Sequence, residues 1–110
     1  MKQSEIWELY LDPVIGSEQQ GRRPAVIISG NLMNEYLPIV IICPITTRIK
    51  NYKGNVLLEP DLTNGLMAPS EIMTFHVRSV SKERLQKKIG SITATQLAEI
   101  KEGLDDLLTL

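Results

Sequence analysis

The chain is poor in the residues that build covalent and metal-linked folds. Among its 110 residues there is one cysteine, one histidine, one tryptophan and one phenylalanine. With Cys43 alone, no disulfide can form within the chain, which fits a reducing compartment. A single histidine and a single cysteine, without a close cluster of carboxylates, argue against a structural zinc site. We therefore expect neither a metal nor a cofactor.

Long apolar runs are also absent, since no window approaches eighteen uninterrupted apolar residues. The first residues carry Glu5, Glu8 and Asp12, which a signal peptide's apolar segment would not contain. No Walker or dinucleotide-binding fingerprint occurs. A hydrophobic content of 43% is typical of a globular protein. We expect one cytoplasmic domain over residues 1–110.

Charge is unevenly distributed. The formal net charge is only −1, which argues against a general nucleic-acid coat protein. From Thr93 onward, however, four acidic residues face one lysine, a net of −3. Residues 1–92 carry eleven Lys and Arg against nine Asp and Glu, a net of +2. The body of the protein could therefore bind a polyanion that avoids the acidic tail.

Most of the chain has the pattern of short strands separated by turns. Strands are expected over 5–11, 25–29, 38–46, 55–59 and 71–80, and a further short one near 87–92. The segment 38–46 is apolar on both faces, which predicts a central strand. Pro44 lies within it, so we expect a bulge or bend there.

The end of the chain has helical periodicity. Thr93 with Gln96 three residues later forms a capping-box pattern, and leucine and isoleucine then recur at helical spacing. Gly103 weakens this helix without ending it. The expected fold is mainly β: a small barrel of antiparallel strands with a C-terminal amphipathic helix.

Two adjacent arginines precede an apolar strand in "GSEQQGRRPAVIIS". Arg23 comes directly before Pro24, which favours an extended backbone at Arg23 and fixes the angle at which it leaves the loop. Its guanidinium presents a planar set of donors that matches phosphate oxygens. The alternative interpretation is a solvated turn with surface charges.

Two further places could contact an anion. Thr46, followed by Thr47, stands at the exit of the central strand, where a hydroxyl could bind a phosphate oxygen or simply end the strand. In the strand expected over 71–80, two-residue alternation would put Thr74, His76 and Arg78 on one face. That row could bind a polyanion or a base edge, or be an ordinary solvated face. A Ser-His-Asp triad is defined by geometry alone, and nothing local supports one.

Together these stretches resemble the MazF/PemK family of bacterial toxins, which are sequence-specific messenger-RNA interferases. "DPVIGSEQQGRRPAVIIS" is similar to the family's N-terminal signature, and "PIT" at 44–46 stands where the family has Ile-Thr at the end of a central strand. "HVRSV" at 76–80 is similar to its Gln-Ile-Arg-Thr strand, and "KERL" at 82–85 and a C-terminal helix follow. The similarity extends over nearly the whole chain.

The resemblance implies an SH3-like barrel that works as a homodimer and cleaves single-stranded RNA without a metal. It implies that Arg23 and Thr46 are catalytic and that the loop from Pro13 to Arg22 is a mobile flap. The residues expected to bind RNA are Ser17, Glu18, Gln19, Arg22, Thr47, His76, Arg78 and Ser79. The implied protein partner is a cognate antitoxin, whose acidic tail would cover the flap and the Arg78 face.

RNA carries its own nucleophile, the 2′-hydroxyl. Fixed donors at Arg23 and Thr46 would stabilise the charge that develops on the phosphate. Products would then end in a 2′,3′-cyclic phosphate or 3′-phosphate, with a 5′-hydroxyl on the other fragment. Candidates for the base are Glu18, His76 and Arg23, although an arginine holds its proton firmly.

The sequence departs from the family in the late strand, where Phe75 and His76 replace the usual Glu-Gln. Because that strand contributes to base reading, the cut sequence can differ from those of better-known relatives.

Two alternatives stay open. A gyrase poison of the CcdB type shares the fold, but its C-terminal Trp-Gly-Ile is absent and this chain ends in "LLTL". The other alternative is a non-catalytic RNA-binding barrel.

Overall fold

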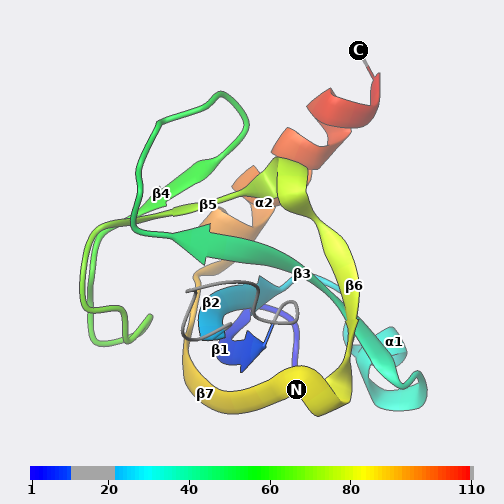
Figure 1. Cartoon of the computed structure of the whole chain (residues 1–110). Coiled ribbons are helices and arrows are strands. Elements are labelled where there is room, and N and C mark those ends of the chain that lie inside the picture. Colours follow the sequence, from blue (N-terminus) through cyan, green and yellow to red (C-terminus); the bar gives the residue numbers. More distant parts are fainter. Residues whose placement is uncertain (11–21, 110) are drawn as a thin grey trace, which may run out of the picture.

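The computed structural model describes residues 1–10 and 22–109. The strands are β1 (Glu5–Tyr10), β2 (Arg22–Ile27), β3 (Ile39–Thr46), β4 (Val56–Leu58), β5 (Ser70–Ile72), β6 (Arg78–Ser81) and β7 (Leu85–Ser91). The helices are α1 (Asn31–Tyr36), α2 (Ala94–Thr109) and two 3₁₀ turns, η1 (Thr74–His76) and η2 (Lys82–Arg84). Figure 1 shows their arrangement, with the N-terminus and the last turn of α2 at opposite ends of the molecule.

The strands form one antiparallel sheet in the order β4-β5-β3-β2-β1-β7, and β6 pairs with β3 beside this path. The expected mainly β architecture with a C-terminal helix is confirmed. The sheet curls as a barrel does, but it keeps two ends at β4 and β7 among the pairings of the described residues, so it is not closed. The strand expected at 87–92 is longer than predicted and begins at Leu85.

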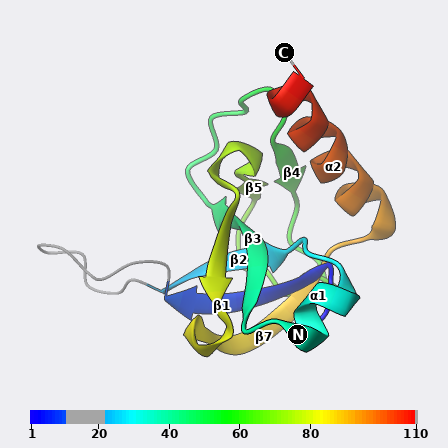
Figure 2. The same cartoon turned by 90° about the vertical axis from the view of Figure 1, so that its right-hand side faces the viewer.

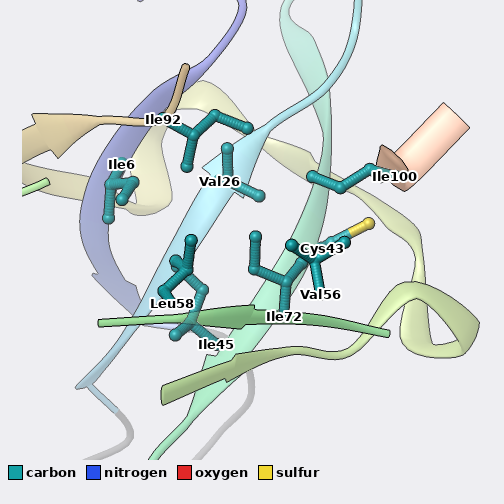
Figure 3. Close-up of a cluster of buried hydrophobic side chains, with 9 residues drawn as sticks. All are labelled: Ile6, Val26, Cys43, Ile45, Val56, Leu58, Ile72, Ile92 and Ile100. Carbon is teal, nitrogen blue, oxygen red and sulfur yellow. The ribbon is translucent and has the colours of Figure 1, made fainter. Parts of the chain in front are cut away.

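Both faces of β2 and β3 are buried, as the apolar pattern of 38–46 predicts. One face joins a cluster with the inner side of α2 (Figure 3), made of Ile6, Val26, Cys43, Ile45, Val56, Leu58, Ile72, Ile92 and Ile100. The other face contributes to a second cluster of Leu9, Ala25, Ile27, Val40, Ile42, Val80 and Leu85. The three paired β2 residues, Ala25, Val26 and Ile27, each belong to one of the two clusters, so burial on both faces holds the register of β2 against β3.

β3 changes partner halfway along its outer edge. Ile39 to Ile42 pair with β6, whereas Ile45 and Thr46 pair with β5. The exchange occurs at Pro44, which has no N–H to donate, and whose carbonyl oxygen accepts a hydrogen bond of 2.8 Å from Met73. Pairing with β2 continues through Pro44 opposite Ala25. The irregularity expected at Pro44 is therefore a change of neighbour on one edge.

The prediction of a single strand over 71–80 is wrong. Between the pairs Ile45–Ile72 and Ile42–Arg78, two β3 residues face the five residues 73–77. The surplus is taken up by the 3₁₀ turn η1, which separates β5 from β6. The common face predicted for Thr74, His76 and Arg78 is consequently wrong as well, because alternation does not continue through the turn. Thr74 is buried, while His76 and Arg78 are exposed.

Helix α2 begins as the capping box predicts. Gln96 N–H donates to Thr93 Oγ1 at 3.1 Å, and Thr93 N–H donates to Gln96 Oε1 at 2.8 Å. Figure 2 shows α2 beside β4. Gly103 is buried there, and a Cβ on it would come within 2.4 Å of the carbonyl oxygen of Gly54. The glycine therefore permits close approach of the helix to the loop before β4.

Helix α1 was not expected from the sequence. It occupies six residues after Gly30, and its buried Asn34 accepts a hydrogen bond from Ser29 Oγ and donates one to the Ser29 carbonyl oxygen at 2.9 Å. Within the part of the chain that the structure describes, no helix has the length and apolar content needed to cross a membrane.

Candidate functional site

Arg23 and Thr46 come from adjacent strands. Ile27, Val26 and Ala25 of β2 lie opposite Ile42, Cys43 and Pro44 of β3. This pairing is observed up to Ala25 opposite Pro44, and Arg23 and Thr46 each lie two residues beyond it, near the ends of the two strands. Residues directly opposite in antiparallel strands point their side chains to the same face. No hydrogen bond or ion pair joins the exposed Arg23 guanidinium to another described residue.

A pocket of about 400 Å³ opens beside Thr46. Its wall includes Arg48 and Lys50 from the loop after β3, and Phe75 and His76 from η1. The Thr46 hydroxyl oxygen accepts a hydrogen bond of 3.1 Å from the Arg48 N–H. A hydroxyl that accepts in this way still has its own proton to donate. Thr46 can therefore offer an O–H to a ligand at the mouth of a pocket with two cations in its wall.

The loop that carries these cations is held by Glu71, which is 1% exposed. One carboxylate oxygen accepts from the N–H groups of Lys50 (2.7 Å) and Asn51 (3.1 Å). The other accepts from the Tyr52 N–H (3.1 Å) and from Asn55 Nδ2 (2.8 Å). Burial raises the pKa of the Glu71 carboxyl, but these hydrogen bonds outweigh it, and the pKa lies below its usual value.

Sequence reasoning missed this role of Glu71. The one signal in the sequence is a carboxylate between Ser70 and Ile72. The structure shows that all three residues of this strand, β5, are buried. A buried charge needs several donors to compensate its loss of hydration. Here the donors come from a loop about twenty residues earlier in the chain, so the partner could not be identified from local pattern.

Three rings line the same pocket. Tyr52 and Phe75 are in edge-to-face contact, with centroids 5.7 Å apart and planes at 60°. Phe75 and His76 lie closer, at 4.7 Å and 55°. Tyr52 is 51% exposed and Phe75 42% exposed. Large aromatic side chains are normally buried, so a cluster exposed in a pocket indicates a ligand surface.

The remaining residues expected to bind RNA are distributed as follows. Arg22 lies opposite Tyr10 on β1, where its Nε donates to the Tyr10 hydroxyl (3.2 Å) and its Nη1 contacts Glu8 Oε1 (3.3 Å). Thr47 is exposed directly after Thr46. On β6, Arg78 and Ser79 are opposite Ile42 and Ile41, so they lie farther back along β3 than the pocket. Ser17, Glu18 and Gln19 fall outside the described residues, as do residues 13–21 of the loop proposed as a flap, whose last residue, Arg22, begins β2.

Comparisons with known proteins give a consistent result. The family model described as "PemK-like, MazF-like toxin of type II toxin-antitoxin system" matches residues 2–108. Endoribonuclease MazF9 of Mycobacterium tuberculosis is 36% identical, over 94% of this chain and 92% of that protein. Endoribonuclease EndoA of Bacillus subtilis is 31% identical, over 100% of this chain and 96% of that protein.

Solved structures of MazF proteins are also similar to this chain. A crystal structure of MazF from Deinococcus radiodurans superimposes with a TM-score of 0.78 at 31% identity, covering 99% of this chain and 96% of that one. A MazE–MazF structure from the same organism has a TM-score of 0.82 at 29% identity, covering 100% and 96%. With the motifs around Arg23 and Thr46 and the fold that carries them, these matches establish that the chain belongs to the PemK-like, MazF-like toxin family of type II toxin–antitoxin systems.

Proposed function

We propose that this protein is the toxin of a type II toxin–antitoxin pair and a metal-independent, sequence-specific endoribonuclease that cleaves single-stranded messenger RNA. The 2′-hydroxyl of the RNA attacks the adjacent phosphorus, the bond to the 5′-oxygen breaks, and that oxygen takes up a proton. The products are a fragment with a 2′,3′-cyclic phosphate, or a 3′-phosphate after hydrolysis, and a fragment with a 5′-hydroxyl. The cytoplasm, where messenger RNA is found, is the proposed site of action.

The register of β2 and β3 is the observation that carries this proposal. It supports a site in which the Arg23 guanidinium and the Thr46 hydroxyl approach one phosphodiester from two neighbouring strands. Both groups can donate hydrogen bonds to phosphate oxygens on which charge develops in the transition state. The base that removes the 2′-proton is proposed among Glu18, His76 and Arg23.

Relatives of known structure include MazE–MazF complexes. We propose that this toxin likewise binds a cognate antitoxin and that it acts as a homodimer. The cations near the pocket and on β6, Arg48, Lys50 and Arg78, suit an acidic segment that folds on binding as well as they suit RNA. Competition between an acidic antitoxin tail and RNA would then inhibit the toxin.

Cleavage assays with matched variants test the function. A long single-stranded RNA is incubated with the protein in the presence of EDTA, and the 5′ ends of the fragments are sequenced. We expect cleavage at a short recurring sequence, and Arg23→Ala and Thr46→Ala should each lower kcat/KM about a hundred- to a thousandfold. Lys101→Ala and Thr95→Ala remove the same types of group from exposed positions on α2 and should leave the rate unchanged.

A single 2′-deoxy substitution at the cut position supplies the test of mechanism. It should abolish cleavage at that site, because the nucleophile is gone. Normal cleavage of the substituted RNA would mean that an external water attacks instead. Specific binding without any cut would support the non-catalytic barrel, and stalled gyrase with intact RNA would support the gyrase poison.

A further inference from the structure

The pocket beside Thr46 has a feature that phosphodiester cleavage does not require. Its wall combines the exposed faces of Tyr52 and Phe75 with the ring of His76, as described above. Neither charge compensation nor proton transfer explains a phenylalanine in this place.

The backbone explains why these rings face a pocket. Ile72 and Arg78 are both paired with β3, and the five residues between them must span a stretch of only two β3 residues. η1 takes up the surplus and leaves Phe75 and His76 exposed, while Thr74 is buried beneath them. The N–H of His76 donates to the Met73 carbonyl oxygen at 3.1 Å, which closes the turn. The rings are therefore carried by a backbone that is anchored at both ends.

Asn55 connects the two segments that supply the rings. Its Nδ2 donates to Glu71 Oε2 at 2.8 Å, and Glu71 in turn accepts the Tyr52 N–H. Its Oδ1 accepts from the Thr74 N–H at 2.9 Å, at the start of η1. The segment with Tyr52 and the segment with Phe75 are thus joined through buried polar groups. An arrangement held in this way loses little entropy when a ligand binds.

We propose that Tyr52, Phe75 and His76 form a stacking subsite for one unpaired nucleobase next to the cleaved phosphodiester, and that this subsite helps determine which RNA sequence is cut. The inference rests on the proposed endoribonuclease function and specifies one part of it. Aromatic faces stack on any base, and the imidazole of His76 can donate to or accept from a base edge. The base enters the pocket while its phosphates lie toward Arg48 and Lys50 at the wall.

The surroundings favour RNA over a protein side chain as the occupant. The pocket combines flat rings with cations and with the Thr46 hydroxyl, and single-stranded nucleic acid presents both bases and phosphates to such a surface. A pocket of about 400 Å³ is within the usual range for small ligands, so a single base is accommodated.

The experiment is a cycle between protein and RNA variants. The substrate is a fluorescent RNA containing the mapped cleavage site, made uncleavable by 2′-deoxy substitution at the cut position. A series of these RNAs carries a single abasic residue at each of the three nucleotides on either side, and dissociation constants are measured by anisotropy. Phe75→Leu and Tyr52→Leu remove a ring but keep an apolar side chain at an exposed position. Tyr36→Leu, on α1 and 72% exposed, is the matched control.

With the wild-type protein, one abasic position should weaken binding about five- to a hundredfold. Phe75→Leu should weaken binding of the intact RNA by a similar factor, and should then be nearly insensitive to the abasic residue at that same position. Fragment sequencing with Phe75→Leu should show relaxed preference at one nucleotide. Tyr36→Leu should behave as the wild type.

Other outcomes distinguish a failure of the stacking subsite from a failure of the proposed endoribonuclease function. If the wild-type protein cleaves but the losses from Phe75→Leu and from every abasic residue simply add, the stacking subsite is wrong and the endoribonuclease stands. If Phe75→Leu weakens binding of an acidic antitoxin peptide and leaves RNA binding unchanged, the pocket belongs to a protein partner, and the subsite is again wrong. If the wild-type protein cleaves no RNA, the proposed function fails and the inference fails with it.

Discussion

The carboxylate of Glu71, in the wall of the pocket, shows how one buried residue can position a neighbouring loop. It is buried, it lies opposite Thr46 in the β3–β5 pair, and it accepts hydrogen bonds from three successive N–H groups of the loop after β3. Each of those hydrogen bonds is strengthened by the negative charge. The loop that carries Arg48 and Lys50 therefore owes its conformation to a single anion on the neighbouring strand.

Glu71→Gln tests this dependence. The amide has nearly the same shape, but its NH₂ would face donors that now meet a carboxylate oxygen. We expect the free energy of unfolding to fall by about 2 kcal/mol in urea denaturation, the scale of hydrogen bonds to a charged group. Glu59→Gln, at an exposed position, is the control and should change stability by less than about 0.5 kcal/mol. Equal stability of the two variants would contradict a special role for Glu71.

Acid sensitivity should come in part from Glu5 on β1. Burial raises the pKa of its carboxyl, but hydrogen bonds from the Lys2 N–H and Trp7 Nε1 and the ion pair with Lys88 outweigh it, so the pKa falls from 4.5 to about 2. A lowered folded-state pKa stabilises the fold above the unfolded value, and this contribution is lost as the pH falls toward the folded value.

Stability of the wild-type protein should therefore decrease between about pH 4.5 and pH 2, and Glu5→Gln should show a smaller decrease over that range. Urea titrations at a series of pH values measure this directly. Glu71, whose pKa is also lowered, contributes with the same sign. An unchanged pH profile in Glu5→Gln would show that its contacts do not persist in solution.

At the residue scale, sequence alone predicts the groups whose neighbours along the chain define them. The proline after Arg23 and the apolar run before Thr46 mark where these two residues lie in the chain, whereas their proposed roles come from the resemblance to the family and stay predictions. Tyr52, Glu71 and Asn55 are not identifiable in this way. Their importance arises from contacts between a loop and a strand separated by some twenty residues, and no local spacing encodes those contacts.

At the scale of elements, the contact between α2 and the loop before β4 depends on two glycines. Gly54 has a φ of +93°, and its carbonyl oxygen lies where a Cβ on Gly103 would be. Replacing a glycine inside a helix by alanine ordinarily stabilises the helix by about 1 kcal/mol. Here the added methyl group would meet backbone at 2.4 Å, so the helix and the loop would have to separate.

Gly103→Ala should consequently lower the free energy of unfolding, by about 1–3 kcal/mol, against its helix propensity. Ala98→Gly, at an exposed position of the same helix, should cost about 1 kcal/mol through propensity alone. Thermal and urea denaturation compare the two variants. A stabilised Gly103→Ala would mean that the loop yields to the helix without cost.

The sequence correctly predicted those elements whose formation depends on residues close together in the chain. The segment 38–46 is a strand with both faces buried, and Thr93 and Gln96 cap a helix, because each depends on nearby residues. The break in 71–80 was not predictable, since that segment alternates as a strand should. The break arises from a feature outside this segment, because β3 changes its partner from β6 to β5 at Pro44. The helix α1 is too short to show helical periodicity.

At the scale of the whole molecule, the uneven distribution of charge has a measurable effect. The acidic residues of α2 are exposed on one element, while Arg48 and Lys50 stand in the wall of the pocket. Counterion release from single-stranded nucleic acid makes log K fall with log salt by about 0.7 for each phosphate neutralised. Global net charge, which is close to zero, does not describe this binding.

Arg48→Gln with Lys50→Gln should reduce the magnitude of that salt slope by about 1.4 and weaken binding at low salt. Lys101→Gln, which removes an exposed cation on α2, should leave the slope unchanged. Anisotropy titrations of uncleavable RNA between about 50 and 200 mM salt provide the measurement. An identical slope in the double variant would place the phosphates elsewhere.

The exchange of partners along β3 also has a consequence for engineering. The five residues 73–77 join two strands that are each paired with β3, and Phe75 and His76 among them are exposed. Changes at Phe75 and His76 leave both buried clusters intact, because neither residue belongs to them. Libraries confined to these two positions would vary ligand preference on a constant scaffold, which makes this turn a practical starting point for reprogramming the enzyme.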